Sequence, residues 1–134
     1  MPAARVLDSH ALLAYFRQEP GSERVKDLLH KAATADRPLH MTEVNYAEVN
    51  YMIRKKDGAH VWEEAARILE TLPVEFHSVT RALADQAAIY RAAHKMSLAD
   101  AFAAALAKEK KAELVTGDPE FKPLEKEIKI HWLK

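Results

Sequence analysis

Short apolar runs alternate with longer stretches of mixed character along almost the whole chain. Five runs have the length of a strand and end in polar or turn-forming residues: RVLD, LHMT, VEFHSV, AELVTGD and IKIHWLK. In the stretches between them, apolar residues such as Val49, Met52 and Ile53 recur every three or four positions, which is the spacing of one helix face. The pattern therefore predicts strands and amphipathic helices in alternation.

Several residues mark where the predicted helices begin and end. Ser22 is expected to be the N-cap of the helix SERVKDLLHKA, because a serine oxygen accepts a hydrogen bond from a free N–H group of the first turn. Gly58 is expected to end the helix NYAEVNYMIRKK, and Pro73 to end HVWEEAARILETL. Two alanine-rich helices, TRALADQAAIYRAAHK and SLADAFAAALAKEKK, are predicted on either side of Met96.

This alternation predicts an α/β fold. Helices that connect parallel strands cover both faces of the sheet, so we expect a three-layer α/β/α arrangement around a central, mainly parallel, five-stranded sheet. The 134 residues contain no repeat, low-complexity tract or linker. A single domain spanning residues 1–134 is therefore expected.

Composition narrows the class of function. The 20 basic residues balance the 20 acidic ones, so the formal net charge is +0, and any contact with a nucleic acid must be local because general nucleic-acid binders are basic. The chain has 0 cysteines, which excludes disulfides, zinc–thiolate sites and thiol nucleophiles. No apolar run approaches the roughly 18 residues of a membrane span, and no leader-like segment precedes Val6. We therefore expect a cytoplasmic protein without a membrane partner.

Four acidic residues occupy a special kind of position. Asp8 follows the first predicted strand, and Asp118 follows the strand AELVTG. Glu48 lies three residues after Asn45, and Asp100 lies three residues after Ser97. An Asn or Ser followed at this spacing by an acid is typical of a capping box at the start of a helix.

Parallel topology would bring these acids together. The carboxyl end of each strand and the start of the helix that follows it lie on the same edge of the sheet. Carboxylates that share one edge repel each other unless a cation joins them, and oxygen ligands without cysteine or clustered histidine favour Mg²⁺ or Mn²⁺ over zinc. Such ions activate water for phosphodiester hydrolysis.

Each acid also has a purely structural interpretation. Asp8 is equally compatible with an N-cap for the helix ALLAYF, and Asp118 in TGDPEF with a turn aspartate. Acids in capping boxes are mostly structural. Glu43 lies close enough to Glu48 to compete for the second acidic position.

The order of the motifs resembles the PIN-domain family of metal-dependent ribonucleases, and most closely its VapC-type toxin branch. The resemblance covers nearly the whole chain and rests on VLDSHALLAYF, MTEVNYAEV, SLADAFAAALA and AELVTGDPEF. In this family a small hydroxyl residue ends the strand, a helix cap follows, and the acid comes next. Thr42, Asn45 and Glu48 match these places, which puts Glu43 in the connecting turn and favours Glu48 as the acid.

The resemblance implies a catalytic, metal-binding quartet formed by Asp8, Glu48, Asp100 and Asp118. Asp8 and Asp100 would be the firmest ligands of Mg²⁺ or Mn²⁺, and the other two would complete the site directly or through water. Ser9 and Thr116 match hydroxyl positions beside the site and would orient carboxylates or a metal-bound water. His10 is more typical of a polar surface residue at a helix start than of a substrate contact.

The leading hypothesis is therefore a divalent-metal-dependent endoribonuclease that is the toxin of a type II toxin–antitoxin pair. The family implies an RNA substrate, a cognate antitoxin and a homodimer. A housekeeping RNA-processing nuclease of the same fold is the first alternative. A phospho-receiver-like binding module is an alternative from a different class, although the sequence VLDSH lacks the acid pair and VEFHSVT lacks the phospho-acceptor aspartate that such a module needs.

Overall fold

The computed structural model describes residues 4–133 and contains five strands and six α-helices in strict chain order. The elements are β1 (Arg5–Leu7), α1 (Ser9–Arg17), α2 (Ser22–Ala35), β2 (Leu39–Thr42), α3 (Glu43–Asp57), α4 (Ala59–Leu69), β3 (Val74–His77), α5 (Arg81–Ala93), α6 (Leu98–Lys110), β4 (Glu113–Thr116), the short 3₁₀ helix η1 (Pro119–Leu124) and β5 (Ile130–Trp132). All five strands of the expected sheet are present.

The strands form one sheet in the order β3-β2-β1-β4-β5, and every neighbouring pair is parallel. The expected α/β fold with a parallel five-stranded sheet is confirmed. The chain adds β2 and β3 on one side of β1 and then crosses to add β4 on the other side. The strand order therefore reverses between β1 and β4, and the edge above such a switch point is where open α/β sheets bind ligands.

The strand order also excludes the receiver-like alternative. Receiver-type doubly wound sheets have the order 2-1-3-4-5, whereas the order here is 3-2-1-4-5. In a receiver, the third strand lies beside the first, so that its aspartate reaches the first strand's acids. Here β3 is an edge strand, separated from β1 by β2, and the phospho-receiver interpretation is wrong.

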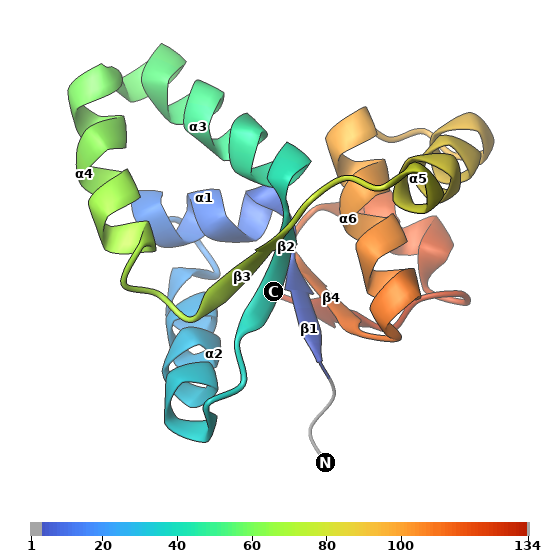
Figure 1. Ribbon diagram of the computed structural model, residues 1–134, viewed down its shortest axis with the longest axis horizontal. Helices are drawn as coiled ribbons and strands as arrows, with labels where there is room; N and C mark the ends of the chain where they lie inside the picture. The colour runs from blue at the N-terminus through green and yellow to red at the C-terminus, as the bar shows by residue number, and fades with distance from the viewer. Residues whose placement is uncertain (1–3, 134) are drawn as a thin grey trace.

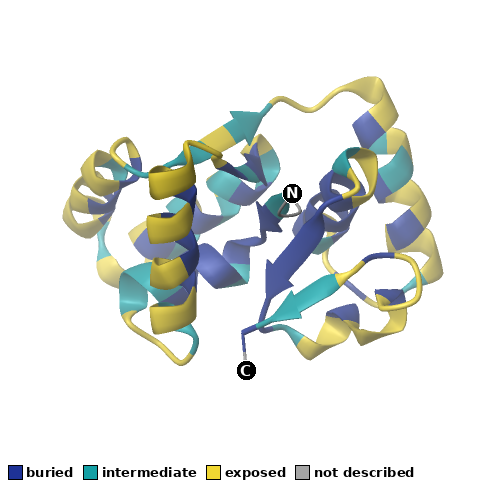
Figure 2. Ribbon diagram, turned by 90° about the horizontal axis from the view of Figure 1, so that it is seen from below, coloured by how far each residue is buried: buried dark blue, intermediate teal, exposed yellow. Residues whose placement is uncertain are grey.

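Helices cover both faces of the sheet (Figure 1). On one face α5 and α6 pack over β1 and β4, with Val6, Leu114 and Phe121 in the same buried cluster. On the other face α1 and α2 cover the sheet through a cluster that contains Leu7 and Val115. Helices α3 and α4 pack against α1 in a third cluster. Buried residues follow the central strands and the inward helix faces, while the outward faces are exposed (Figure 2).

Helix boundaries agree with the predictions at Gly58 and differ at Ser22. Gly58 ends α3 at a φ of 103°, a backbone region that favours glycine. Ser22 is the first residue of α2, and the N-cap is Gly21 at a φ of 97°. A Cβ atom at Gly21 would lie 3.1 Å from Leu133 Cβ, so the cap position needs glycine and the prediction of a serine cap is wrong. Among the described residues, no helix is long and apolar enough to cross a bilayer.

Candidate metal-binding active site

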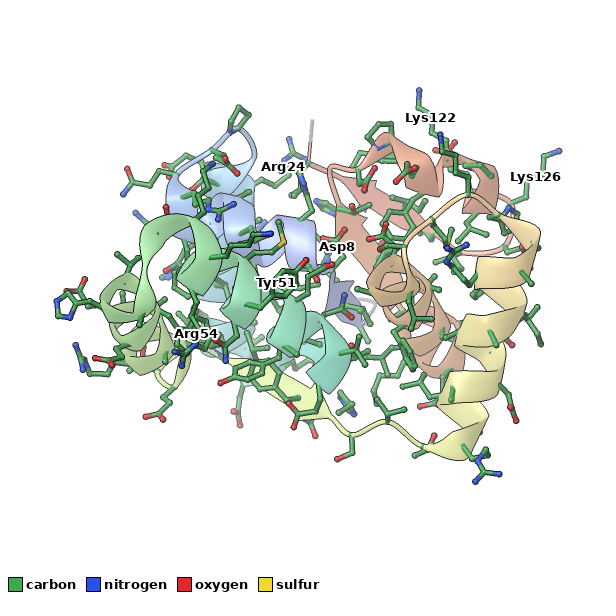
Figure 3. All side chains as sticks on the ribbon, turned by 90° about the horizontal axis from the view of Figure 1, so that it is seen from above. Asp8, Arg24, Tyr51, Arg54, Lys122 and Lys126 are labelled. Carbon is green, nitrogen blue, oxygen red and sulfur yellow. The ribbon has the colours of Figure 1, made fainter. Side chains whose placement is uncertain are left out.

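Asp8 lies at the switch point, directly after β1, and its side chain is completely buried. It is the N-cap of α1, because one carboxylate oxygen accepts a hydrogen bond of 2.7 Å from the backbone N–H of Ala11. The other oxygen accepts a hydrogen bond from the hydroxyl of Thr116, at the end of β4. Asp8 therefore bridges the two strands between which the strand order reverses. Figure 3, which looks onto this edge, shows Asp8 near the centre of the molecule.

The segment after β4 extends the same hydrogen-bonded chain. The Thr116 hydroxyl oxygen accepts a hydrogen bond of 3.0 Å from the backbone N–H of Asp118. Asp118 in turn is the N-cap of η1, with its Oδ1 atom accepting a bond of 2.9 Å from the N–H of Glu120. The expected turn role of Asp118 is therefore present, and it leaves the second carboxylate oxygen of Asp118 available for another partner.

Asp100 reaches the site from the first turn of α6. Ser97 is the N-cap of this helix, and its hydroxyl oxygen accepts a hydrogen bond of 3.1 Å from the N–H of Asp100. The Ser-x-x-Asp capping pattern predicted at this position is confirmed. The helix break near Met96 returns the chain to the carboxyl edge of the sheet, as the prediction required.

The prediction that Asn45 caps α3 and that Glu48 lies in the first turn of this helix is wrong. Helix α3 begins at Glu43, and its N-cap is Thr42, whose hydroxyl oxygen accepts a hydrogen bond of 3.0 Å from the N–H of Asn45. Asn45 is therefore the third residue of the helix, and Glu48 lies beyond the first turn. Glu43 is the first helical residue rather than part of a connecting turn. It is exposed and lines a surface hollow with Tyr46 and Phe76 that contains none of the four acids.

Asn45 has a structural role that the sequence did not reveal. Its side chain is fully buried and accepts a hydrogen bond from Thr42, while its amide donates bonds of 2.9 Å to the Ser9 hydroxyl and 3.1 Å to the Ala99 carbonyl. These contacts join α1, β2, α3 and α6 immediately around the acids. Ser9, which is also buried, bonds to Asn45 and so supports the helix packing of the site.

The acids influence each other electrostatically. Burial raises the pKa of Asp8 to about 8, with the charges of Asp100 and Asp118 adding to the rise and the bonds from Thr116 and Ala11 opposing it. Burial, which has the largest effect, and the charges of Asp118 and Glu48 together raise the pKa of Asp100 to about 6. All four predicted acids therefore belong to one electrostatic site. Among residues 4–133, no lysine, arginine or histidine forms an ion pair with any of them.

The exposed side of this site has the geometry of a cation site. Asp100, Asp118 and Glu120 each offer a carboxylate oxygen, and these atoms lie within 4.8 Å of one another. Asp8 is buried beside them, and Glu48 is half-buried. The donor set consists of oxygen alone, which suits Mg²⁺ or Mn²⁺. The uncompensated charge and the oxygen donors both fit a divalent ion.

Glu120 was missed by sequence reasoning. The available signal was its place two residues after Asp118, in the first turn of a short helix that starts at Pro119. His10, considered as a substrate contact, lies against the segment between Thr116 and Asp118. A Cβ atom at Gly117 would lie only 2.7 Å from His10 Nε2.

Comparison with known proteins assigns the family. The family model of the PIN domain matches residues 5–127. No curated protein sequence matches the chain significantly. Among solved structures, the DNA-bound VapBC of Salmonella typhimurium matches with a TM-score of 0.77 at 14% identity, covering 99% of this chain and 100% of the other.

Two further structures have the same fold. VapBC2 of Rickettsia felis, bound to a DNA fragment from its promoter, has a TM-score of 0.75 at 16% identity and covers 96% of this chain and 97% of its own. VapC20 of Mycobacterium tuberculosis, a sarcin–ricin loop cleaving toxin, has a TM-score of 0.70 at 20% identity. The match covers 90% of this chain and 94% of the VapC20 chain. Because the family model spans nearly the entire described chain, the protein belongs to the PIN-domain family.

Proposed function

We propose that the protein is a divalent-metal-dependent endoribonuclease and the toxin component of a type II toxin–antitoxin pair. The observation that carries this proposal is the convergence of carboxylate oxygens from α6 and η1 within 4.8 Å, above the buried Asp8 at the switch point. Two of the acids have raised pKa values, and none is paired with a cation among the described residues. A dication would offset this charge.

Asp100, Asp118 and Glu120 would hold the ion at the exposed side, and Glu48 would complete the site directly or through water. Asp8 would act as the buried ligand, since each of its oxygens accepts one hydrogen bond and keeps a second lone pair. A bound Mg²⁺ or Mn²⁺ supplies water activation and polarisation of the phosphoryl oxygen. Thr116 positions Asp8 and Asp118 relative to each other through its hydroxyl.

The toxin role is supported by the structural neighbours. VapBC pairs of several bacteria share this fold, and VapC20 is a toxin that cleaves the sarcin–ricin loop. A groove between α1, α3 and α4 with a volume of about 420 Å³ offers a surface for an antitoxin segment; its lining includes the apolar Phe16, Val61 and Ile68 and the charged Arg17, Asp57 and Glu64. We also propose that the protein acts as a homodimer, and that it acts on RNA in the cytoplasm.

The direct test is cleavage of single-stranded RNA by untagged protein in Mg²⁺ or Mn²⁺. Cleavage should stop when EDTA is added, and Asp100→Asn should lower the rate by a factor on the order of 100 or more, because the charge that holds the ion is lost. The matched control is Asp85→Asn, which removes a carboxylate from an exposed position on α5 and should leave the rate unchanged. Binding of Mn²⁺, followed by electron paramagnetic resonance, should weaken in parallel with activity in Asp100→Asn.

Two results would contradict the nuclease assignment: equal cleavage by Asp100→Asn and wild type, or cleavage that persists in EDTA. The toxin role needs a separate experiment. Expression of the wild-type protein should arrest growth, expression of Asp100→Asn should not, and co-expression of a protein encoded next to the gene should restore growth. RNA cleavage without growth arrest would favour a housekeeping nuclease.

A further inference from the structure

A second set of potential ligands lies on strands β2 and β3. In the register of these parallel strands, His40 pairs with Glu75, and Thr42 pairs with His77. Since alternate residues of a strand point to opposite faces, His40, Glu75 and His77 share one face of the sheet. His40 also pairs with Val6 of β1, which packs against α5 and α6. The three side chains therefore lie on the face covered by α5 and α6, next to the edge of the sheet.

Their donor atoms converge. His40 Nδ1 lies 2.8 Å from His77 Nε2 and 3.5 Å from a carboxylate oxygen of Glu75. The three residues each offer one ligand atom within 4.8 Å of the others. Two imidazole nitrogens and one carboxylate oxygen form the donor set of three-ligand zinc sites, which leave a fourth tetrahedral position open.

Only a small movement is needed to accept an ion. Zinc–nitrogen bonds of about 2.0–2.1 Å in a tetrahedron hold two nitrogens roughly 3.3 Å apart, compared with 2.8 Å between the two rings here. The rings are tilted by 47° to each other with centroids 5.0 Å apart, so modest side-chain rotations open the gap. Glu75 is 55% exposed and can move freely toward the ion.

The charges around the rings are mixed. Burial, followed by the positive charge of Lys110, lowers the pKa values of both His40 and His77, which favours the neutral imidazole that binds metals. Lys110 at the end of α6 repels a dication, while Glu75 and Glu109 attract it. Removing the lysine charge should therefore strengthen metal binding.

We propose that His40, Glu75 and His77 form a binding site for a borderline transition-metal dication such as Zn²⁺, separate from the acidic site, which fastens the edge strand β3 to β2. This proposal does not rest on the nuclease function. In the alternative interpretation the two histidines are only a hydrogen-bonded pair without affinity for metal.

The test is a calorimetric titration of untagged wild-type protein with Zn²⁺ in the presence of excess Mg²⁺, which occupies oxygen-only sites. We expect binding of one Zn²⁺ per chain at this site. His77→Gln and Glu75→Gln should each weaken it at least about tenfold, and Lys110→Gln should strengthen it. The matched control is His60→Gln, which removes an exposed histidine 3.4 Å from Glu64 on α4 and should leave zinc affinity unchanged.

Thermal melts provide an independent readout. Zn²⁺ should raise the Tm of the wild type and of Lys110→Gln but not of His77→Gln. Because Glu75 is exposed, Glu75→Gln keeps the test valid if His77→Gln fails to fold. The proposal is overturned if no saturable Zn²⁺ binding persists in excess Mg²⁺, if Glu75→Gln binds Zn²⁺ like the wild type, or if Asp100→Asn alone abolishes the binding.

Discussion

Replacing Asp8 by asparagine should stabilise the metal-free protein at neutral pH. Asp8 is fully buried between α1 and β4, and its ionised form is costly there without a cation. Asparagine has the same shape, and its oxygen can still accept the hydrogen bond from the N–H of Ala11 that caps the helix. Its amide N–H can donate to the Thr116 hydroxyl oxygen, although the Thr116 hydroxyl loses Asp8 as its acceptor. The charge is therefore lost while the cap is retained.

The magnitude follows from the pKa of the carboxyl group. Burial raises the pKa of Asp8 from 3.8 to about 8, so the folded state binds more protons than the unfolded state between these values, and stability falls as pH rises through this window. Between pH 3.8 and pH 7, a span of roughly three pH units, this group lowers the free energy of unfolding by about 1.4 kcal/mol per unit, or about 4 kcal/mol in all. Asp8→Asn should recover part of this free energy at pH 7 and almost none at pH 4.

The assay is urea denaturation after treatment with EDTA, at several pH values from 4 to 8. The quantity of interest is the difference in unfolding free energy between Asp8→Asn and the wild type, because the contributions of groups that the substitution leaves unchanged cancel. Thr80→Ala is a matched control, since Thr80 caps α5 through a bond of 3.1 Å to the N–H of Leu83 and has no charge. It should lower stability by about 1 kcal/mol at every pH.

One result would refute this reasoning. If Asp8→Asn destabilises the metal-free protein by a similar amount at pH 4 and pH 8, as Thr80→Ala is expected to do, then Asp8 acts only as a helix cap. Its burial would then carry no electrostatic cost that a metal could offset.

Three other substitutions and one control substitution have expected outcomes in the same denaturation assay. Thr116→Val should cost about 1–3 kcal/mol, because it removes the hydroxyl that bonds to Asp8 and accepts from the next segment; an unchanged midpoint would contradict this. Asn45→Ala should cost about 2–4 kcal/mol by leaving buried partners without hydrogen bonds, whereas Asn50→Ala on the same helix should stay within about 0.5 kcal/mol. Burial alone would raise the pKa of Glu113, but the nearby cations lower it overall, so Glu113→Gln should destabilise at pH 7 and lose its effect as the pH falls through the lowered pKa. If Glu113→Gln lowers the free energy of unfolding equally at both ends of the pH range, the nearby cations do not stabilise the fold through the Glu113 charge.

The fold was predictable because its signals are local. Strand β2 coincides with the predicted run LHMT, and β4 lies within the predicted run AELVTGD. The parallel sheet follows from the alternation of such runs with helices. Asp8 and Asp118 could be placed on one edge because Asp8 directly follows β1 and Asp118 lies two residues after the end of β4. Asp100 could be placed because Ser97, three residues before it, is a residue type that commonly caps helices, and it does cap α6.

The start of α3 could not be predicted from spacing alone. Thr42 and Asn45 are both residue types that cap helices, but only Asn45 has an acid three residues later, so the capping-box pattern favours the wrong residue. The choice is made by tertiary contacts, since Asn45 is buried by bonds to Ser9 and to the carbonyl of Ala99, which lie far away in the sequence. A local pattern contains no information on such contacts. The histidine pair on β2 and β3 was invisible for the same reason, because it depends on strand register.

Two opposing free energies decide whether capping alone explains the carboxylate of Asp8: the stabilisation that the N-terminus of α1 gives it, and the cost of burying it. The N-terminus of a helix stabilises a carboxylate by about 0.3–1 kcal/mol when exposed and up to about 2 kcal/mol when partly buried. Burial beside Asp100 and Asp118 costs about 4 kcal/mol at neutral pH, because it raises the pKa of Asp8 from 3.8 to about 8. A serine or asparagine could cap α1 without this cost. A carboxylate at this position is therefore poorly explained by capping alone, which supports the proposal that a dication offsets its charge.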